Sequence, residues 1–155
     1  MNEQGKSEMV KRVVCKDEWM SLGISSCVET IIQSVDNEFG SKAELFIPIL
    51  VRMDRREGAE FEATKCAGVY VFIYEDGTCL RVGKSQQNAS KRALEHCRDN
   101  TSSKDGTIRM EDLRLSNKTH MLVFALQGES AHWVLALESY LEKTLNPRIP
   151  PQRNG

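Results

Sequence analysis

Residues 68–85 read GVYVFIYEDGTCLRVGKS, and this stretch decides the fold that we expect. After its opening glycine, the segment 69–74 contains only β-branched and aromatic residues, which is typical of a strand. Asp76-Gly77 is a turn dipeptide, and residues 78–83 follow as a second short strand. The stretch therefore predicts an antiparallel β-hairpin.

The chain after the hairpin predicts a helix, a strand and another helix. The first helix is expected from about residue 88 to 97, and the apolar run 120–126 (HMLVFAL) predicts a third strand. A final helix is expected to end at Leu145, because Pro147 and two further prolines follow it. This order predicts an α/β (α+β) fold, with a small, mainly antiparallel three-stranded sheet flanked by helices.

The chain before the hairpin predicts an N-terminal helical extension. Between residues 17 and 38, apolar side chains recur at helical spacing with an interruption near Gly23, which predicts one or two amphipathic helices. The apolar run 45–53 (LFIPILVRM) predicts a strand, and Pro48 would place that strand at the edge of a sheet. The segment 54–64 that follows is charged and loop-like, which marks it as the most plausible boundary inside the chain. We therefore expect two regions, a helical and extended one over 1–65 and a second domain over 66–155.

Composition narrows the class of protein without choosing a function. The 155 residues carry a net charge of −1, so a basic surface must be local. The five cysteines are widely spaced and form no CxxC pair, which argues against a disulfide framework and a structural zinc site. No secretory signal or membrane span is expected. These features predict a soluble, intracellular protein.

The hairpin carries the most specific motif in the chain. Gly68-Val69-Tyr70 lies on its first strand and Arg81-Val82-Gly83 on its second, so the side chains of Tyr70 and Arg81 can converge on one face of the sheet. This arrangement resembles the paired motif of the GIY-YIG nuclease family, with Arg81 in place of the second tyrosine.

Later residues follow in the order that this family shows. Arg92 and His96 are four residues apart and share a face of the predicted helix. Glu138 lies in the last helix, and the expected asparagine is Asn154 or Asn146, of which Asn154 is preferred for its distance beyond Glu138. The resemblance covers residues 66–154.

The resemblance implies a metal-dependent endonuclease that cuts DNA, with five catalytic residues. Tyr70 would activate or orient the attacking water, and Arg92 suits a phosphate because a guanidinium donates two parallel hydrogen bonds. Glu138 would bind one Mg²⁺ (or Mn²⁺) that keeps mostly water as its other ligands. Arg81 and His96 complete the set.

Local charge favours DNA as the partner, which would place the protein in the cytoplasm or at the nucleoid. No membrane partner is expected, because no stretch is long and apolar enough to span one. Residues 81–98 hold five basic residues and one acidic residue, a local net charge of +4. Within this patch Lys84, Lys91 and Arg98 are expected to bind DNA, together with Asn154. The region 1–65 is left for target recognition or for the surface of a homodimer.

The replacement of the second motif tyrosine by Arg81 allows two outcomes for catalysis. A cation at this position could stabilise a Tyr70 phenolate or the phosphate, in which case the chemistry survives by a changed route. In the alternative, the chain is a catalytically inactive module of the same fold that binds nucleic acid. An interaction domain unrelated to nucleic acid, in which the hairpin is only a scaffold, is the third hypothesis.

Overall fold

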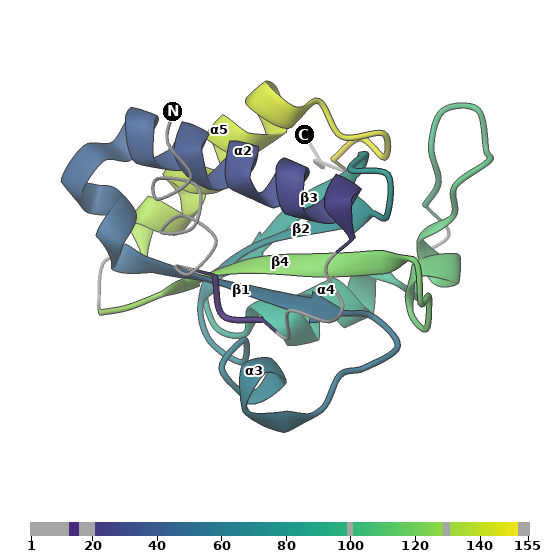
Figure 1. The fold of residues 1–155 in the computed structure, drawn as a ribbon, viewed down its shortest axis with the longest axis horizontal. Helices are drawn as coiled ribbons and strands as arrows, with labels where there is room; N and C mark the ends of the chain where they lie inside the picture. The colour runs from purple at the N-terminus through teal and green to yellow at the C-terminus, as the bar shows by residue number, and fades with distance from the viewer. Residues whose placement is uncertain (1–12, 16–20, 99–100, 129–130, 152–155) are drawn as a thin grey trace.

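The computed structural model describes residues 13–15, 21–98, 101–128 and 131–151. In these residues one antiparallel sheet has the strand order β1-β4-β2-β3, with helices on both faces (Figure 1). The predicted α+β class is confirmed, although the sheet has four strands instead of three. The elements are α2 (Leu22–Phe39), η2 (Gly40–Leu45), β1 (Phe46–Arg52), α3 (Gly58–Glu62), β2 (Gly68–Tyr74), β3 (Cys79–Ser85), α4 (Ala89–His96), η3 (Met110–Leu113), β4 (Thr119–Leu126) and α5 (His132–Leu145).

The fourth strand is the apolar run that precedes the hairpin. β1 pairs along its whole length with β4, and it lies at the edge of the sheet as Pro48 predicted. The Pro48 carbonyl points away from β4 and accepts a hydrogen bond from the Val14 amide at 3.0 Å. The proline nitrogen faces the same outer side, so no ladder hydrogen bond is lost. The sheet therefore includes strands from both of the expected regions, 1–65 and 66–155.

The sheet carries a hydrophobic layer on each face. Helices α2 and α5 cover one face, whereas α3 and α4 lie over the other (Figure 1). Alternate residues of β2 therefore enter different cores, with Val71 facing α2 and α5 and Tyr70 facing α4. Because β2 and β4 are central strands that are buried on both faces, their sequences are continuous apolar runs.

The helix α2 starts next to the interruption that was expected near Gly23, and residues 17–20 of the predicted helical segment lie outside the described residues. It begins at Leu22, after Ser21, whose hydroxyl accepts a hydrogen bond from the Ile24 amide at 3.2 Å. Gly23 lies in the first turn, and a Cβ there would come within 2.5 Å of the Glu75 carbonyl oxygen. The glycine therefore permits close approach to the β2–β3 turn and does not break the helix.

Both edges of the sheet receive a segment from near an end of the chain. Val14 bridges to β1, and the Ile149 amide donates to the Leu80 carbonyl of β3 at 2.8 Å. Such coverage limits the edge-to-edge pairing that exposed strands invite. Among the described residues, no helix is both long and apolar enough to cross a membrane.

Candidate active site

Tyr70 lies at the centre of the candidate site, on the face of β2 that α4 covers. Its side chain is fully buried, and its hydroxyl forms a hydrogen bond with Nδ1 of His96. The ring crosses over Gly83, the residue directly opposite on β3. A Cβ at Gly83 would lie 2.3 Å from Cζ and from the hydroxyl oxygen of Tyr70. Position 83 thus holds a glycine because the tyrosine ring occupies the space of a side chain.

The helix α4 brings His96 to Tyr70. The Asn88 side chain caps the helix by accepting from the Lys91 amide at 3.0 Å. Ala89 and Ala93 are buried and small, which lets the helix lie close to the sheet. His96 follows one turn after Ala93 and is 9 % exposed, so it is the member of the pair nearer to solvent.

Arg92 lies one helical turn before His96 and shares its flank of α4, as the four-residue spacing predicts. Its side chain is 52 % exposed and forms an ion pair with Glu95, with Nη1 and Oε2 3.2 Å apart. An exposed pair of this kind contributes little to stability. The guanidinium is therefore available to bind an anion from solution.

Arg81 is buried on the same face of the sheet as Tyr70. It pairs with Phe72 in the β2–β3 register, and its side chain is 3 % exposed. Nη1 donates to the Thr101 hydroxyl at 3.2 Å, whereas the buried Nε has no hydrogen-bond partner. Among the described residues it forms no salt bridge. A buried cation held in this way is costly unless an anion joins it.

The charges around Tyr70 act on its phenol in opposite directions. Burial has the largest effect and raises the pKa of Tyr70 well above its usual value. Arg81 and then Arg92 lower the pKa, and Glu138 raises it. The phenol is therefore neutral near pH 7, and all three charged groups lie close enough to alter its ionisation.

Glu138 acts on this site electrostatically, from the helical layer on the other face of the sheet. It is half-buried on α5, one turn from the buried Val134 and Leu141. Since α5 packs against β3, the strand at the sheet edge, a side chain on α5 can extend past that edge towards Tyr70. A half-buried carboxylate that acts on the Tyr70 phenol is of the ligand type that hard divalent cations prefer, with water as the remaining ligands.

A multi-ligand metal cluster is not found in the part of the chain that the structure describes. No group of three or more His, Cys, Asp or Glu side chains converges there. Mg²⁺ binding through the single carboxylate of Glu138 stays a prediction.

The predicted DNA-binding residues lie in different places. Lys84 is half-buried near the end of β3, while Lys91 on α4 and Arg98 in the turn after α4 are exposed and line a groove that Arg92 does not line. Asn154 lies outside the described residues. Asn146 ends α5 in a left-handed conformation with φ of 47°.

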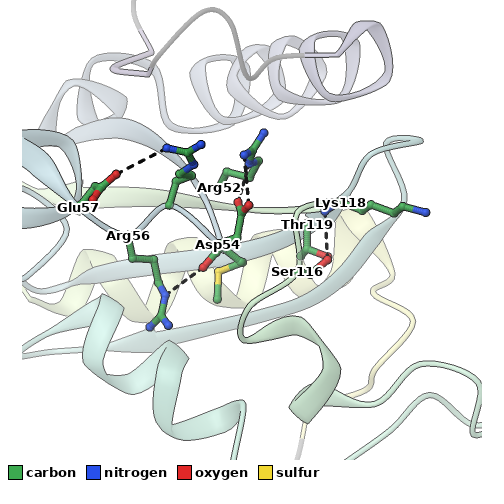
Figure 2. Close-up of polar contacts among 9 residues, drawn as sticks. Arg52, Asp54, Arg56, Glu57, Ser116, Lys118 and Thr119 are labelled. Atoms are coloured by element: carbon green, nitrogen blue, oxygen red, sulfur yellow. Dashed lines mark hydrogen bonds and ion pairs between the residues drawn. The ribbon is translucent and has the colours of Figure 1, made fainter.

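A further group of cations, which the sequence analysis did not single out, lies where β1 ends and β4 begins (Figure 2). Arg52 is paired with Asp54, Nε to Oδ1 at 2.5 Å. The Arg56 Nε donates to the Met53 carbonyl at 3.0 Å, and burial followed by the nearby Arg114 lowers the pKa of Arg56. The adjacent Arg55 and Arg56 were a signal in the sequence, but Arg114, the other cation near Arg56, is nearly sixty residues further along the chain.

Comparisons with known proteins identify no relative. No family model, curated protein or solved structure matches the chain.

Proposed function

We propose that this chain is a Mg²⁺-dependent nuclease of the GIY-YIG type that hydrolyses phosphodiester bonds in DNA. The observation that carries the proposal is the hydrogen bond between Tyr70 and His96 on the flank of α4 that also presents Arg92. Phosphodiester hydrolysis needs a group that takes a proton from water and a cation that holds the phosphate. Such a nuclease works where DNA is, in the cytoplasm or at the nucleoid.

Tyr70 and His96 act as a pair in this mechanism. Because Tyr70 is fully buried and His96 is 9 % exposed, water approaches the pair from the histidine side. Tyr70 passes its proton to Nδ1 of His96, and the positive charge of Arg81 makes the resulting phenolate less costly. The phenolate then takes a proton from the attacking water, so that hydroxide attacks phosphorus while the pair holds one proton more than before. Arg92 holds two phosphoryl oxygens through its planar guanidinium. A cation bound by Glu138 would stabilise the charge that develops on the phosphoryl and leaving oxygens.

Cleavage of supercoiled plasmid tests the proposal. With Mg²⁺ or Mn²⁺ we expect relaxed or linear DNA, and with EDTA we expect none. Glu138→Ala should fail to cut at any Mg²⁺ concentration. Glu29→Ala removes another half-buried helical carboxylate, on α2, and should cut like the wild type. If the wild type cuts neither plasmid, single-stranded nor branched DNA with either metal, the nuclease proposal is wrong.

Arg81→Met separates a functional role of Arg81 from a structural one. Replacing a buried cation that lacks a salt bridge with an apolar side chain of similar size is often neutral, or stabilising by about 1–4 kcal/mol. We therefore expect an unchanged or higher Tm, together with cleavage about tenfold slower, as for the loss of one hydrogen bond to a charged group. A lower Tm with unchanged cleavage would assign Arg81 to structure alone.

The second candidate function is a nucleic-acid-binding module that has lost catalysis. The observation that favours it is Arg81 itself, which stands where the motif has a tyrosine hydroxyl. Such a module retains labelled DNA in a salt-dependent way, since binding by cations to phosphates weakens as salt rises. Retention without metal-dependent cutting would select this function over the nuclease.

A further inference from the structure

A groove lies between α3 and α4, on the flank of α4 that faces away from Tyr70. Its volume is about 450 Å³, within the range of about 300–1,000 Å³ typical of small-molecule sites. Lys91 and Leu94 line it from α4, at the three-residue spacing of one helix face, and Arg98 lines it from the turn after the helix. Phe61 and Lys65 line it from the α3 side.

The two walls of the groove are fixed to each other by backbone hydrogen bonds. The Ala89 amide donates to the Cys66 carbonyl at 2.7 Å, and the Ser90 amide donates to the Thr64 carbonyl at 3.3 Å. The Thr64 hydroxyl in turn donates to the Phe61 carbonyl at 2.6 Å. The position of Phe61 relative to α4 is therefore set before any ligand arrives, which reduces the entropy cost of binding.

The groove combines positive charge with an accessible ring. Lys91 and Arg98 are exposed, and neither forms a salt bridge within the described residues. The acidic member of the lining, Glu95, is already paired with Arg92. Phe61 is half-buried, with the Lys65 ammonium 5.4 Å from its ring centre. Cations beside an aromatic ring in a groove are the features with which proteins hold single-stranded nucleic acid.

We propose that the groove between α3 and α4 binds an unpaired nucleotide, whose base stacks on Phe61 and whose flanking phosphates meet Lys91 and Arg98. This inference rests on the proposed function, because it names the form of the substrate. Arg92 lies beside the groove, because its ion-pair partner Glu95 lines the groove. One strand can thus contact both. In a blunt duplex the base faces are stacked inside, so Phe61 selects DNA that has an unpaired segment beside the cut.

Fluorescence anisotropy in EDTA tests the groove without cleavage. The probes are a labelled oligothymidine strand and a blunt duplex hairpin of matched length. Phe61→Ala should weaken single-strand binding by about tenfold or more, as for one lost stacking contact, and should change duplex binding by less than about twofold. Phe61→Tyr should restore the affinity. Lys91→Glu should lower the salt dependence of single-strand binding.

Matched controls remove a similar group far from the groove. Leu22→Ala deletes a side chain that is 87 % exposed on α2, and Lys42→Glu reverses a charge on η2. Both should bind like the wild type. If Phe61→Ala binds the single strand as tightly as the wild type, the groove proposal is overturned, even where plasmid is cut. If Phe61→Ala binds it more weakly while no DNA is cut, the groove proposal stands and the nuclease proposal fails.

Discussion

Replacing Tyr70 with phenylalanine is expected to slow Mg²⁺-dependent plasmid cleavage by about 10²–10⁴-fold, the usual effect of losing a positioned proton-transfer group. The change removes only the hydroxyl that bonds to His96 and keeps the ring that fills the space over Gly83. The fold should therefore persist, with a loss of about 1 kcal/mol for a buried hydrogen bond. Initial rates of plasmid cutting and thermal unfolding measure the two effects separately.

A double variant shows whether Tyr70 and His96 act as one unit. If they do, Tyr70→Phe, His96→Gln and the double variant should all lose about the same activity, because removing either member already disables the pair. Losses that multiply in the double variant would mean that the two residues act independently. A Tyr70→Phe enzyme with more than about half the wild-type rate would remove Tyr70 from the mechanism.

Alkaline unfolding gives a readout of Tyr70 that does not depend on cleavage. The folded protein raises the pKa of Tyr70, so it holds the phenol proton more tightly than the unfolded chain does. The resulting stability is complete below about pH 10, the usual tyrosine pKa, and is lost as pH rises further. Tyr70→Phe should therefore lose less stability than the wild type above that pH. Cys27 and Cys79, whose pKa values burial raises to about 11 and about 12, are common to both proteins and cancel in the comparison.

Local signals predicted the part of the fold that carries the site. The hairpin over 68–85 and the helix near 88–97 follow from strand propensity, a turn dipeptide and helical spacing, and the structure confirms both. Pro48 predicted an edge strand for the same local reason, and that too is confirmed. Each signal lies within about twenty residues and needs no knowledge of distant partners.

Features that depend on distant partners were missed. β1 joins the sheet through β4, about seventy residues later, and no local pattern identifies that pairing. The burial of Arg81 depends on Thr101 and on the packing of the α4 layer. The basic patch was counted along the sequence, whereas in the structure Lys91 and Arg98 line the groove between α3 and α4 and Arg92 does not. The positions of these residues along the predicted helix already indicate this difference, but a net charge summed over residues 81–98 does not show it.

Replacing Gly83 with alanine is expected to destabilise the protein by about 1–3 kcal/mol or more, the usual cost of overpacking a core, and to lower Tm by roughly 2–12 °C. The backbone itself tolerates alanine, because Gly83 is not among the glycines with positive φ. Alanine also suits a strand better than glycine does. Any loss of stability therefore reports the contact between the new methyl group and the Tyr70 ring, 2.3 Å from Cζ.

The Tyr70 ring has no space into which it can move. It is fully buried and lies edge-on to the rings of Phe72 and His96, each with its centre 5.7 Å away. Combining the glycine change with two substitutions at Tyr70 isolates the contact. Tyr70→Phe keeps Cζ, so Gly83→Ala should remain costly in that background, whereas Tyr70→Leu removes Cζ and should abolish most of the cost. An equal cost in all three backgrounds would place the clash elsewhere. The expected pattern would mean that Gly83 leaves the space that the Tyr70 ring occupies. The two halves of the paired motif would then pack against each other as one unit, independently of their part in catalysis.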